Sequence, residues 1–433
     1  MVVRKNIPLE CLLVTLPVTI HDVLETINRN TLGIVFIVDV DRKLIGALTD
    51  GDARRLLLAG ATLNDSITRD SAFFNKSPHY LPIDCEISEI WSLFERDLRC
   101  IPLLDTSHRV VDYSTRARIR QFMVLQPDIG QQEMSNVLEC VASGWISSQG
   151  RFIGLFERAF SDYLGGGHAI AVSNGTVALH LAMTTLGIGQ GDEVIVPNFT
   201  FGASINAIVH SGATPVLADV DPDTWTIDLD ELTRLITPNT RAIMPVHIYG
   251  QPARIDEIME IASEKGIYVI EDCAEALGAT YKKRRVGLDG DCTCFSFFAN
   301  KNITTGEGGM AIFKDAGMAK RARILRDHGM SKQKRYWHDY AGFNFRMTNM
   351  QAAIGAAQMG RVDELLNRKK SIFQAYDSLL SEHPGVSLLP KNDWSENSYW
   401  LYTIILNGYE EGVRDKLITN LGFRGIDARP GFY

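Results

Sequence analysis

Short apolar segments that alternate with helical segments constrain the fold of the chain beyond residue 130. Most are continuously apolar, which is typical of strands buried on both faces of a parallel sheet. The strand candidates are HAIAV (168–172), DEVIV (192–196), ATPVLAD (213–219), RAIMPV (241–246), IYVIE (267–271), CTCFSF (292–297) and MAIF (310–313). We therefore predict an α/β fold with a mostly parallel central sheet over residues 129–365. One long helix over 347–380 then leads into a smaller C-terminal domain over 366–433.

The region before residue 123 contains an internal repeat. FIVDVDRKLIGALTDGDARR (36–55) aligns without gaps on PLLDTSHRVVDYSTRARIRQ (102–121). Each copy reads as a strand, a polar turn, a second strand and the start of a helix. The sequence therefore predicts a pair of α+β units over residues 1–122, followed by a polar linker over 123–128.

Composition excludes several classes of protein. The net charge is -8, and this acidic balance argues against a nucleic-acid surface. Neither a membrane-spanning apolar run nor a signal-peptide core is present, so we expect a soluble, cytoplasmic protein. The cysteines are scattered and form no C-x-x-C pair, which predicts neither disulfides nor a metal site. They are Cys11, Cys85, Cys100, Cys140, Cys273, Cys292 and Cys294.

Three features follow directly after predicted strands, where ligand sites of parallel sheets gather. The turn S-N-G-T (173–176) opens a helix and can bind a phosphate through its N–H groups. Asp272 ends one strand, and Lys301 follows another. Taken separately, S-N-G-T and Asp272 can be ordinary helix caps, and Lys301 can be a surface lysine. Together they match pyridoxal 5'-phosphate, whose phosphate, ring nitrogen and aldehyde need an anion site, an acid and a lysine.

Longer motifs then identify a family. They are GWISSQG (144–150), AVSNGTVALHLA (171–182), GDEVIVPNFTF (191–201), PVHIYGQPA (245–253), VIEDCAEALGA (269–279), FSFFANKNITTGEGGM (295–310) and GFNFRMTNMQAAIG (342–355). In this order they make residues 129–433 resemble the DegT-type sugar-nucleotide aminotransferases, which are fold type I pyridoxal-phosphate enzymes. GWISSQG and EDCAEALGA are most similar to the perosamine synthases, which aminate C4 of GDP-4-keto-6-deoxy-mannose.

The resemblance implies roles for the residues at the cofactor ring. Lys301 matches the lysine that binds the cofactor covalently and later moves a proton, and Asp272 matches the acid paired with the pyridinium nitrogen. Phe201 matches the aromatic ring stacked on the cofactor. Glu275 lies where the family has a polar residue near the ring hydroxyl. Because some relatives carry histidine in place of Lys301 and catalyse a dehydration, the lysine favours transamination.

The resemblance also implies the phosphate contacts and the assembly. Gly175, Thr176 and Ser296 match residues that bind the phosphate. Asn344 matches an asparagine that reaches the phosphate from the neighbouring subunit, which implies a homodimer or a higher oligomer. The alternative for Asn344 is a turn residue before Arg346. For His328, Tyr249 and His338, substrate contact and a structural role both stay open.

The repeat region resembles a second family. G-A-L-T-D-G-D (46–52) resembles the signature of CBS domains, which occur as tandem pairs and often bind adenine nucleotides. In that family the residues that match Thr49 and Asp52 contact phosphate and ribose. The second copy has Asp112 in place of the glycine and Arg118 in place of the acid. We expect at most one nucleotide half-site; a purely structural or dimerising pair is the alternative.

The resemblance implies that L-glutamate donates an amino group to a keto sugar carried on a nucleoside diphosphate. The nucleotide of the sugar stays open, because GDP, UDP and dTDP sugars are all possible substrates. A second alternative is that the chain is a regulatory protein that binds the cofactor without catalysis. The sequence ends at GIDARPGFY (425–433), whereas similar family members continue. We expect that the chain is truncated or that the small domain is naturally short.

Overall fold

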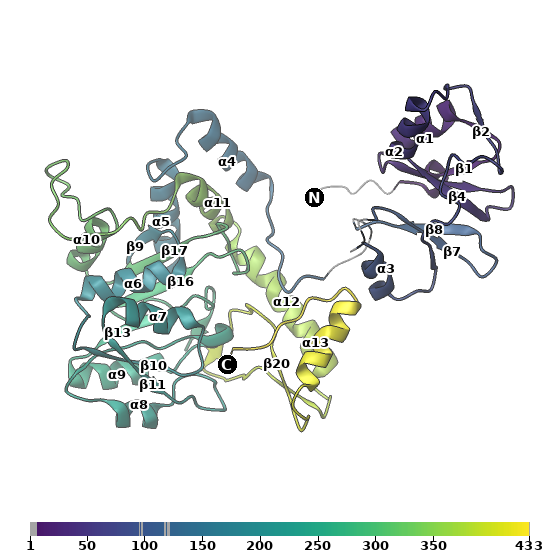
Figure 1. The fold of residues 1–433 in the computed structure, drawn as a ribbon. Helices are drawn as coiled ribbons and strands as arrows, with labels where there is room; N and C mark the ends of the chain where they lie inside the picture. Colours follow the sequence, from purple (N-terminus) through teal and green to yellow (C-terminus); the bar gives the residue numbers. More distant parts are fainter. Residues whose placement is uncertain (1–6, 95, 97, 117, 119–121, 433) are drawn as a thin grey trace. The chain divides into compact units, whose positions relative to one another are not determined.

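The computed structural model describes residues 7–94, 96, 98–116, 118 and 122–432 (Figure 1). They form two compact units: residues up to 124 with 411–430, and residues 125–410 with those from 431 onward. Segment 411–430, which carries α13 (Val413–Phe423), joins the first unit because the main chain of Phe122 bonds to Gly425 and Asp427. This segment, assigned above to the small domain, thus groups with the N-terminal residues.

The first unit contains two three-stranded sheets of the same topology. In each, the first strand is parallel and the third antiparallel to the middle strand. One sheet holds β1 (Leu13–Thr15), β3 (Ile34–Val38) and β4 (Leu44–Thr49), and the other β6 (Leu81–Pro82), β7 (Ile101–Leu104) and β8 (Val110–Ser114). Around them lie η1 (Leu9–Leu12), α1 (Ile20–Asn30), α2 (Asp50–Leu58), α3 (Ile87–Phe94), β2 (Val18–Thr19) and β5 (Ser66–Ile67).

The strand register confirms the gap-free repeat. The pairing shifts after Ile37↔Gly46 in the first copy and after Leu103↔Asp112 in the second, which are equivalent positions in the alignment. The copies also meet through a symmetric pair of bonds. The Leu44 N–H donates to His108 and the Val110 N–H donates to Arg42, at 3.2 and 2.9 Å. The repeat is therefore a pair of units related by an approximate two-fold axis.

The second unit is built on a seven-stranded sheet in the order β11-β10-β12-β13-β16-β17-β9. Its strands are β9 (His168–Val172), β10 (Glu193–Pro197), β11 (Thr214–Ala218), β12 (Thr240–Ile243), β13 (Tyr268–Asp272), β16 (Cys292–Ser296) and β17 (Gly309–Phe313). Only β17 runs antiparallel to its neighbours. All seven predicted strands are confirmed, and so is the mostly parallel sheet.

Helices cover both faces of this sheet, because every strand except the edge strand β11 sends alternate side chains into two separate cores. One core packs against α5 (Arg151–Leu164), α8 (Leu229–Leu235), α9 (Ile255–Lys265) and α11 (Asn349–Met359). The other packs against α6 (Gly175–Leu186), α7 (Gly202–Ser211) and α10 (Ala316–Leu325) (Figure 1). The remaining elements are α4 (Gln131–Ser143), η2 (Ile248–Gly250), α12 (Val362–Leu380), β14 (Thr280–Tyr281), β15 (Arg284–Arg285), β18 (Val386–Leu388), β19 (Ser395–Glu396) and β20 (Ile404–Leu406).

The single long helix predicted over 347–380 is wrong. α11 ends at Met359, Gly360 follows, and α12 begins only at Val362. Between them Arg361 has φ -133° and ψ 22°, which is not helical. Its guanidinium bonds to Asp128 and Glu133 at 2.7 and 3.1 Å. The low helix propensity of glycine and these bonds account for the break.

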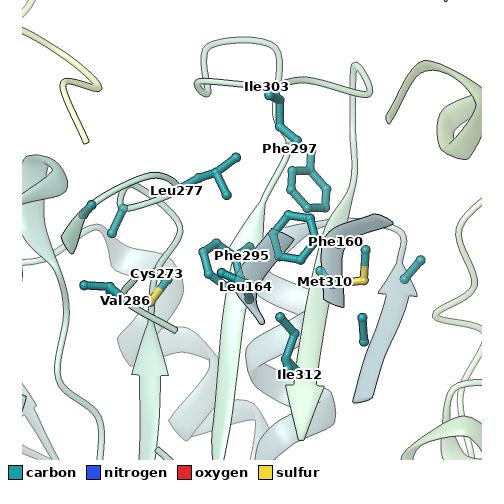
Figure 2. Packing of buried hydrophobic residues seen from close by; sticks show 14 of the residues in the cluster. Phe160, Leu164, Cys273, Leu277, Val286, Phe295, Phe297, Ile303, Met310 and Ile312 are labelled. Atoms are coloured by element: carbon teal, nitrogen blue, oxygen red, sulfur yellow. The ribbon is translucent and has the colours of Figure 1, made fainter. Parts of the chain in front are cut away.

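An aromatic cluster supports the loop between β16 and β17 (Figure 2). The Phe160 ring packs against Phe295 and Phe297, with ring centroids 5.0 and 5.4 Å apart. The main chain of Phe297 then holds both ends of the loop, because its N–H donates to Gly308 and its carbonyl accepts from Thr305. Burial of these rings therefore fixes the loop in which Lys301 lies.

A buried hydrogen bond between a histidine and a carboxylate lies beneath the strand ends. His247 Nε2 and Glu271 Oε2 are 3.2 Å apart, and both side chains are fully buried. Since His247 Nδ1 accepts from the Ala253 N–H, its Nε2 carries the proton. Burial raises the pKa of Glu271, but the bonds from His247, Gly290 and Thr293 outweigh burial and hold that pKa below its usual range.

We predict that His247→Ala lowers the free energy of unfolding by about 2–3 kcal/mol, because the buried Glu271 carboxylate loses the hydrogen bond from Nε2 and the Ala253 N–H loses its acceptor. Urea unfolding measures the change, and the exposed His168→Ala is the control. Since folding lowers the pKa of Glu271, its contribution is complete above its unfolded pKa and is lost as the pH falls through its folded pKa. Equal urea midpoints for the two variants would contradict this assignment.

Candidate active site

Lys301 lies beside two acids and an indole ring. Its Nζ is 3.8 Å from Glu275 Oε1, and its side chain is 13% exposed. Burial lowers the pKa of Lys301, while Glu275 and Asp272 act in the opposite direction. Burial also raises the pKa of Glu275 to about 7, against the attraction of Lys301. The pKa of Glu275 therefore lies near neutral pH and that of Lys301 below its usual range, which suits groups that transfer protons.

Asp272 ends β13 and is held by two neutral donors. Ser204 Oγ donates to its Oδ2 at 2.7 Å, and the Ala274 N–H donates to its Oδ1 at 3.0 Å. Asp272 and Ser204 are both buried. Among the residues that the structure describes, no cation lies within ion-pair distance of Asp272, so its carboxylate can accept a further charged N–H.

The turn after β9 and the end of β16 form one cradle. Asn174 Oδ1 caps α6 by accepting the Val177 N–H at 2.9 Å, so the first N–H groups of the helix face outward. A Cβ on Gly175 would lie 2.8 Å from Cβ of Ser296, so only glycine fits at that position. Thr176 follows on the exposed first turn of α6. These three predicted phosphate residues therefore lie together, in a geometry suited to an anion.

The other predicted site residues have contacts of their own. Phe201 precedes α7 with a 60% exposed side chain, and its ring lies 5.6 Å from that of Phe432. Asn344 is exposed, and its Oδ1 accepts from Arg346 Nε at 3.0 Å. That bond is compatible with the turn role.

Tyr249, His328 and His338, for which the sequence allows substrate contact or a structural role, form hydrogen bonds within the chain. The Tyr249 N–H donates to Glu275 Oε2 at 2.6 Å, and its hydroxyl accepts the Phe432 N–H at 3.0 Å. The His338 ring contacts the His328 carbonyl through Nδ1 at 2.8 Å. Each therefore has a structural role, and Tyr249 also orients Glu275.

Sequence reasoning missed two residues of this site, Ser204 and Trp400. Ser204 is one turn into α7, three residues after Phe201, so its side chain lies on the same side of the helix start. That spacing was the available signal. Trp400 lies over Lys301 from almost a hundred residues further along the chain, and no local pattern connects the two.

The CBS residues make internal contacts too. Thr49 caps α2: its hydroxyl bonds to Asp52 Oδ2 at 2.6 Å and accepts the Asp52 N–H. In the second copy, Arg118 Nη1 donates to Asp112 Oδ1 at 2.7 Å, and the guanidinium lies 4.0 Å from the Tyr113 ring centroid. The two residues that depart from the CBS pattern therefore pair with each other.

The site fits pyridoxal 5'-phosphate. The Gly175 cradle suits its phosphate, the buried Asp272 suits a pyridinium N–H, and Lys301 offers the amine for its aldehyde. A seven-stranded sheet with an acid and a lysine at these strand ends defines a fold type I aminotransferase.

The chain belongs to the DegT/DnrJ/EryC1/StrS aminotransferase family, whose model matches residues 127–433. The CBS domain model matches residues 10–59. Each predicted resemblance is therefore confirmed. The evidence for the second CBS-like copy is the strand register that it shares with the first.

Similar proteins include two named GDP-perosamine synthase. That of Caulobacter vibrioides is 49% identical over 316 residues, covering 72% of this chain and 84% of that protein. That of Vibrio cholerae is 44% identical over 310 residues, with coverage of 72% and 84%. A putative sugar aminotransferase from Streptococcus pneumoniae, solved in a PLP form, has a TM-score of 0.69 at 33% identity and covers 72% of this chain and 85% of its own. Within the described residues, no helix has the length and apolarity required to span a bilayer.

Proposed function

We propose that the chain transfers the amino group of L-glutamate to C4 of GDP-4-keto-6-deoxy-mannose, with pyridoxal 5'-phosphate as cofactor. The observation that carries this proposal is the cluster of Lys301, Glu275 and Asp272 at the strand ends. The names of the relatives that are 44–49% identical support the GDP sugar. We place the reaction in the cytoplasm, as a step toward a surface polysaccharide.

Each residue of the cluster has a separate task. The bound cofactor supplies an aldehyde that joins amino groups covalently and a ring that accepts electrons. Asp272, oriented by Ser204, keeps a proton on the ring nitrogen through its negative charge. Lys301 removes and returns the proton on the carbon that carries the amino group, and Glu275 lies close enough to set its protonation. Gly175, Thr176 and Ser296 hold the phosphate, while Phe201 covers the ring.

Mass spectrometry of the product tests the substrate. Glutamate and the cofactor are supplied with GDP-, UDP- or dTDP-linked 4-keto-6-deoxy sugars, and the chain is the wild type or Lys301→Ala. We expect an aminated sugar from the GDP substrate and only with the wild type. A lysine-dependent product from a UDP or dTDP sugar would contradict the assignment of a GDP sugar as substrate. The assignment as a sugar aminotransferase would still hold. No product from any sugar, although cofactor binds at Lys301, would favour a regulatory protein.

We also propose that the enzyme is a homodimer in which Asn344 reaches the phosphate of the neighbouring subunit. Support comes from α4, which exposes apolar side chains spaced by one helical turn. Met134, Leu138 and Val141 are 58%, 68% and 56% exposed, and Trp145 and Ile146 continue this surface. An exposed apolar stripe of this kind is typical of a protein interface.

Leu138→Glu is therefore expected to convert the dimer into monomers and to abolish amination, because the site loses Asn344 of its neighbour. Light scattering after size exclusion measures the mass. Leu379→Glu on α12 is the matched control, since Leu379 is 78% exposed outside this surface. A dimer of normal mass in Leu138→Glu would show that α4 does not form the interface.

For the CBS unit we propose at most one adenine nucleotide per chain, at Thr49 and Asp52 of the first copy. The Asp112–Arg118 pair supports this limit, because it places a cation at the position equivalent to Asp52 and an acid at the position equivalent to Gly46. Calorimetric titration of the full chain with AMP and with ATP measures the stoichiometry. Two nucleotides per chain would contradict the proposal, and none would favour a role in assembly alone.

A further inference from the structure

The indole ring of Trp400 covers the amine of Lys301. Lys301 Nζ is 3.8 Å from the centroid of the ring, and Trp400 is only 4% exposed. The indole N–H donates to the Asn300 carbonyl at 2.7 Å, and Lys369 Nζ donates to the Trp400 carbonyl at 3.0 Å. The ring is thus fixed at both its side chain and its main chain.

The residues before Trp400 are attached to the same loop. Asn302 Nδ2 donates to the Ser398 carbonyl at 2.7 Å, on the other side of Lys301 from Asn300. The Ser398 hydroxyl donates to the Glu275 carbonyl, and its N–H donates to Gly250 at 3.1 Å. Segment 398–400 therefore joins the lysine loop to the segment that carries Glu275.

This arrangement answers a need of the proposed reaction. An amine that transfers protons must be held in one place in its charged form as well as in its neutral form. Burial disfavours the charge on Lys301, and Glu275 is a weak partner because its own pKa is raised to about 7. The face of an indole attracts a cation without itself titrating.

We infer that Trp400 is a positioning residue for Lys301, and that its indole face stabilises the protonated amine beside Glu275. The inference rests on the proposed function for its purpose. Its test does not, because the readout is the reactivity of the amine and requires no sugar substrate.

The test is competitive labelling with acetic anhydride, which acetylates only neutral amines. The full chain, freed of cofactor, is labelled near neutral pH, and acetylation of Lys301 is measured by mass spectrometry against exposed Lys265. Trp400→Leu removes the π face and is expected to speed labelling of Lys301 about three- to tenfold. Trp400→Phe keeps an aromatic face and is expected to stay within about twofold of the wild type. Trp394→Leu is the control, since Trp394 packs on Tyr281 at 5.3 Å.

Fluorinated tryptophans give a second test that leaves the side chain almost unchanged in shape. Successive fluorine atoms weaken the π face while the indole N–H remains, so labelling of Lys301 is expected to rise with each fluorine. Equal labelling of the Leu and Phe variants, or the absence of a trend with fluorination, would overturn the inference. Failed amination with the expected labelling would instead count against the proposed function alone.

Discussion

Lys301→Ala is expected to abolish glutamate-dependent amination. The substitution removes the covalent anchor and the group that moves the proton, and loss of proton transfer alone costs about 10²–10⁴-fold in rate. The measurement is the rate of appearance of aminated sugar by mass spectrometry.

Lys301→Arg is the companion variant. It keeps the positive charge but replaces the amine with a guanidinium that does not deprotonate in proteins, so it should be as inactive as the alanine variant. Thermal unfolding establishes that both variants are folded. Residual activity of Lys301→Arg near the wild-type rate would show that Lys301 serves only as a charge, and the proposed mechanism would be wrong.

Asp272→Asn is expected to lower the amination rate about 10²–10³-fold, the usual cost of losing one preorganised electrostatic contact. Asparagine fits the same space and can keep the bond from Ser204, but it carries no charge to hold a proton on the ring nitrogen. Steady-state kinetics should show the loss mainly in kcat.

Asp219→Asn is the matched control for Asp272→Asn. Asp219 also follows a strand of the central sheet, β11, and its carboxylate accepts from Asn198 Nδ2 at 2.9 Å. Its substitution should leave kcat nearly unchanged. Similar losses in both variants would mean that Asp272 acts through the stability of the sheet and not through the cofactor.

The sequence predicts the strands of the central sheet well because their apolar runs reflect burial on both faces. It does not predict the order of the strands in the sheet, since β9, the first of them along the chain, pairs with β17, the last. The break between α11 and α12 escaped prediction for a similar reason. Arg361 leaves the helix in response to Asp128 and Glu133, which lie far away in the sequence.

The candidate site shows the same limit. Lys301, Asp272 and Gly175 could be predicted because each is at a strand end and within a recognisable motif. The contacts of Ser204 with Asp272 and of Trp400 with Lys301 could not, because they arise only when distant segments meet. For Ser204 the sequence offers only its spacing from Phe201. In the CBS pair, the departures at Asp112 and Arg118 were visible in the sequence. Their mutual bond was not.

The most direct test of the central claim is to find the lysine that holds the cofactor. The purified chain is incubated with pyridoxal 5'-phosphate, reduced with borohydride, digested and examined by mass spectrometry. We predict a single phosphopyridoxyl group, on the peptide that contains Lys301, and its absence when glutamate is added before reduction. A label on another lysine, or one that glutamate does not remove, would contradict transamination at Lys301.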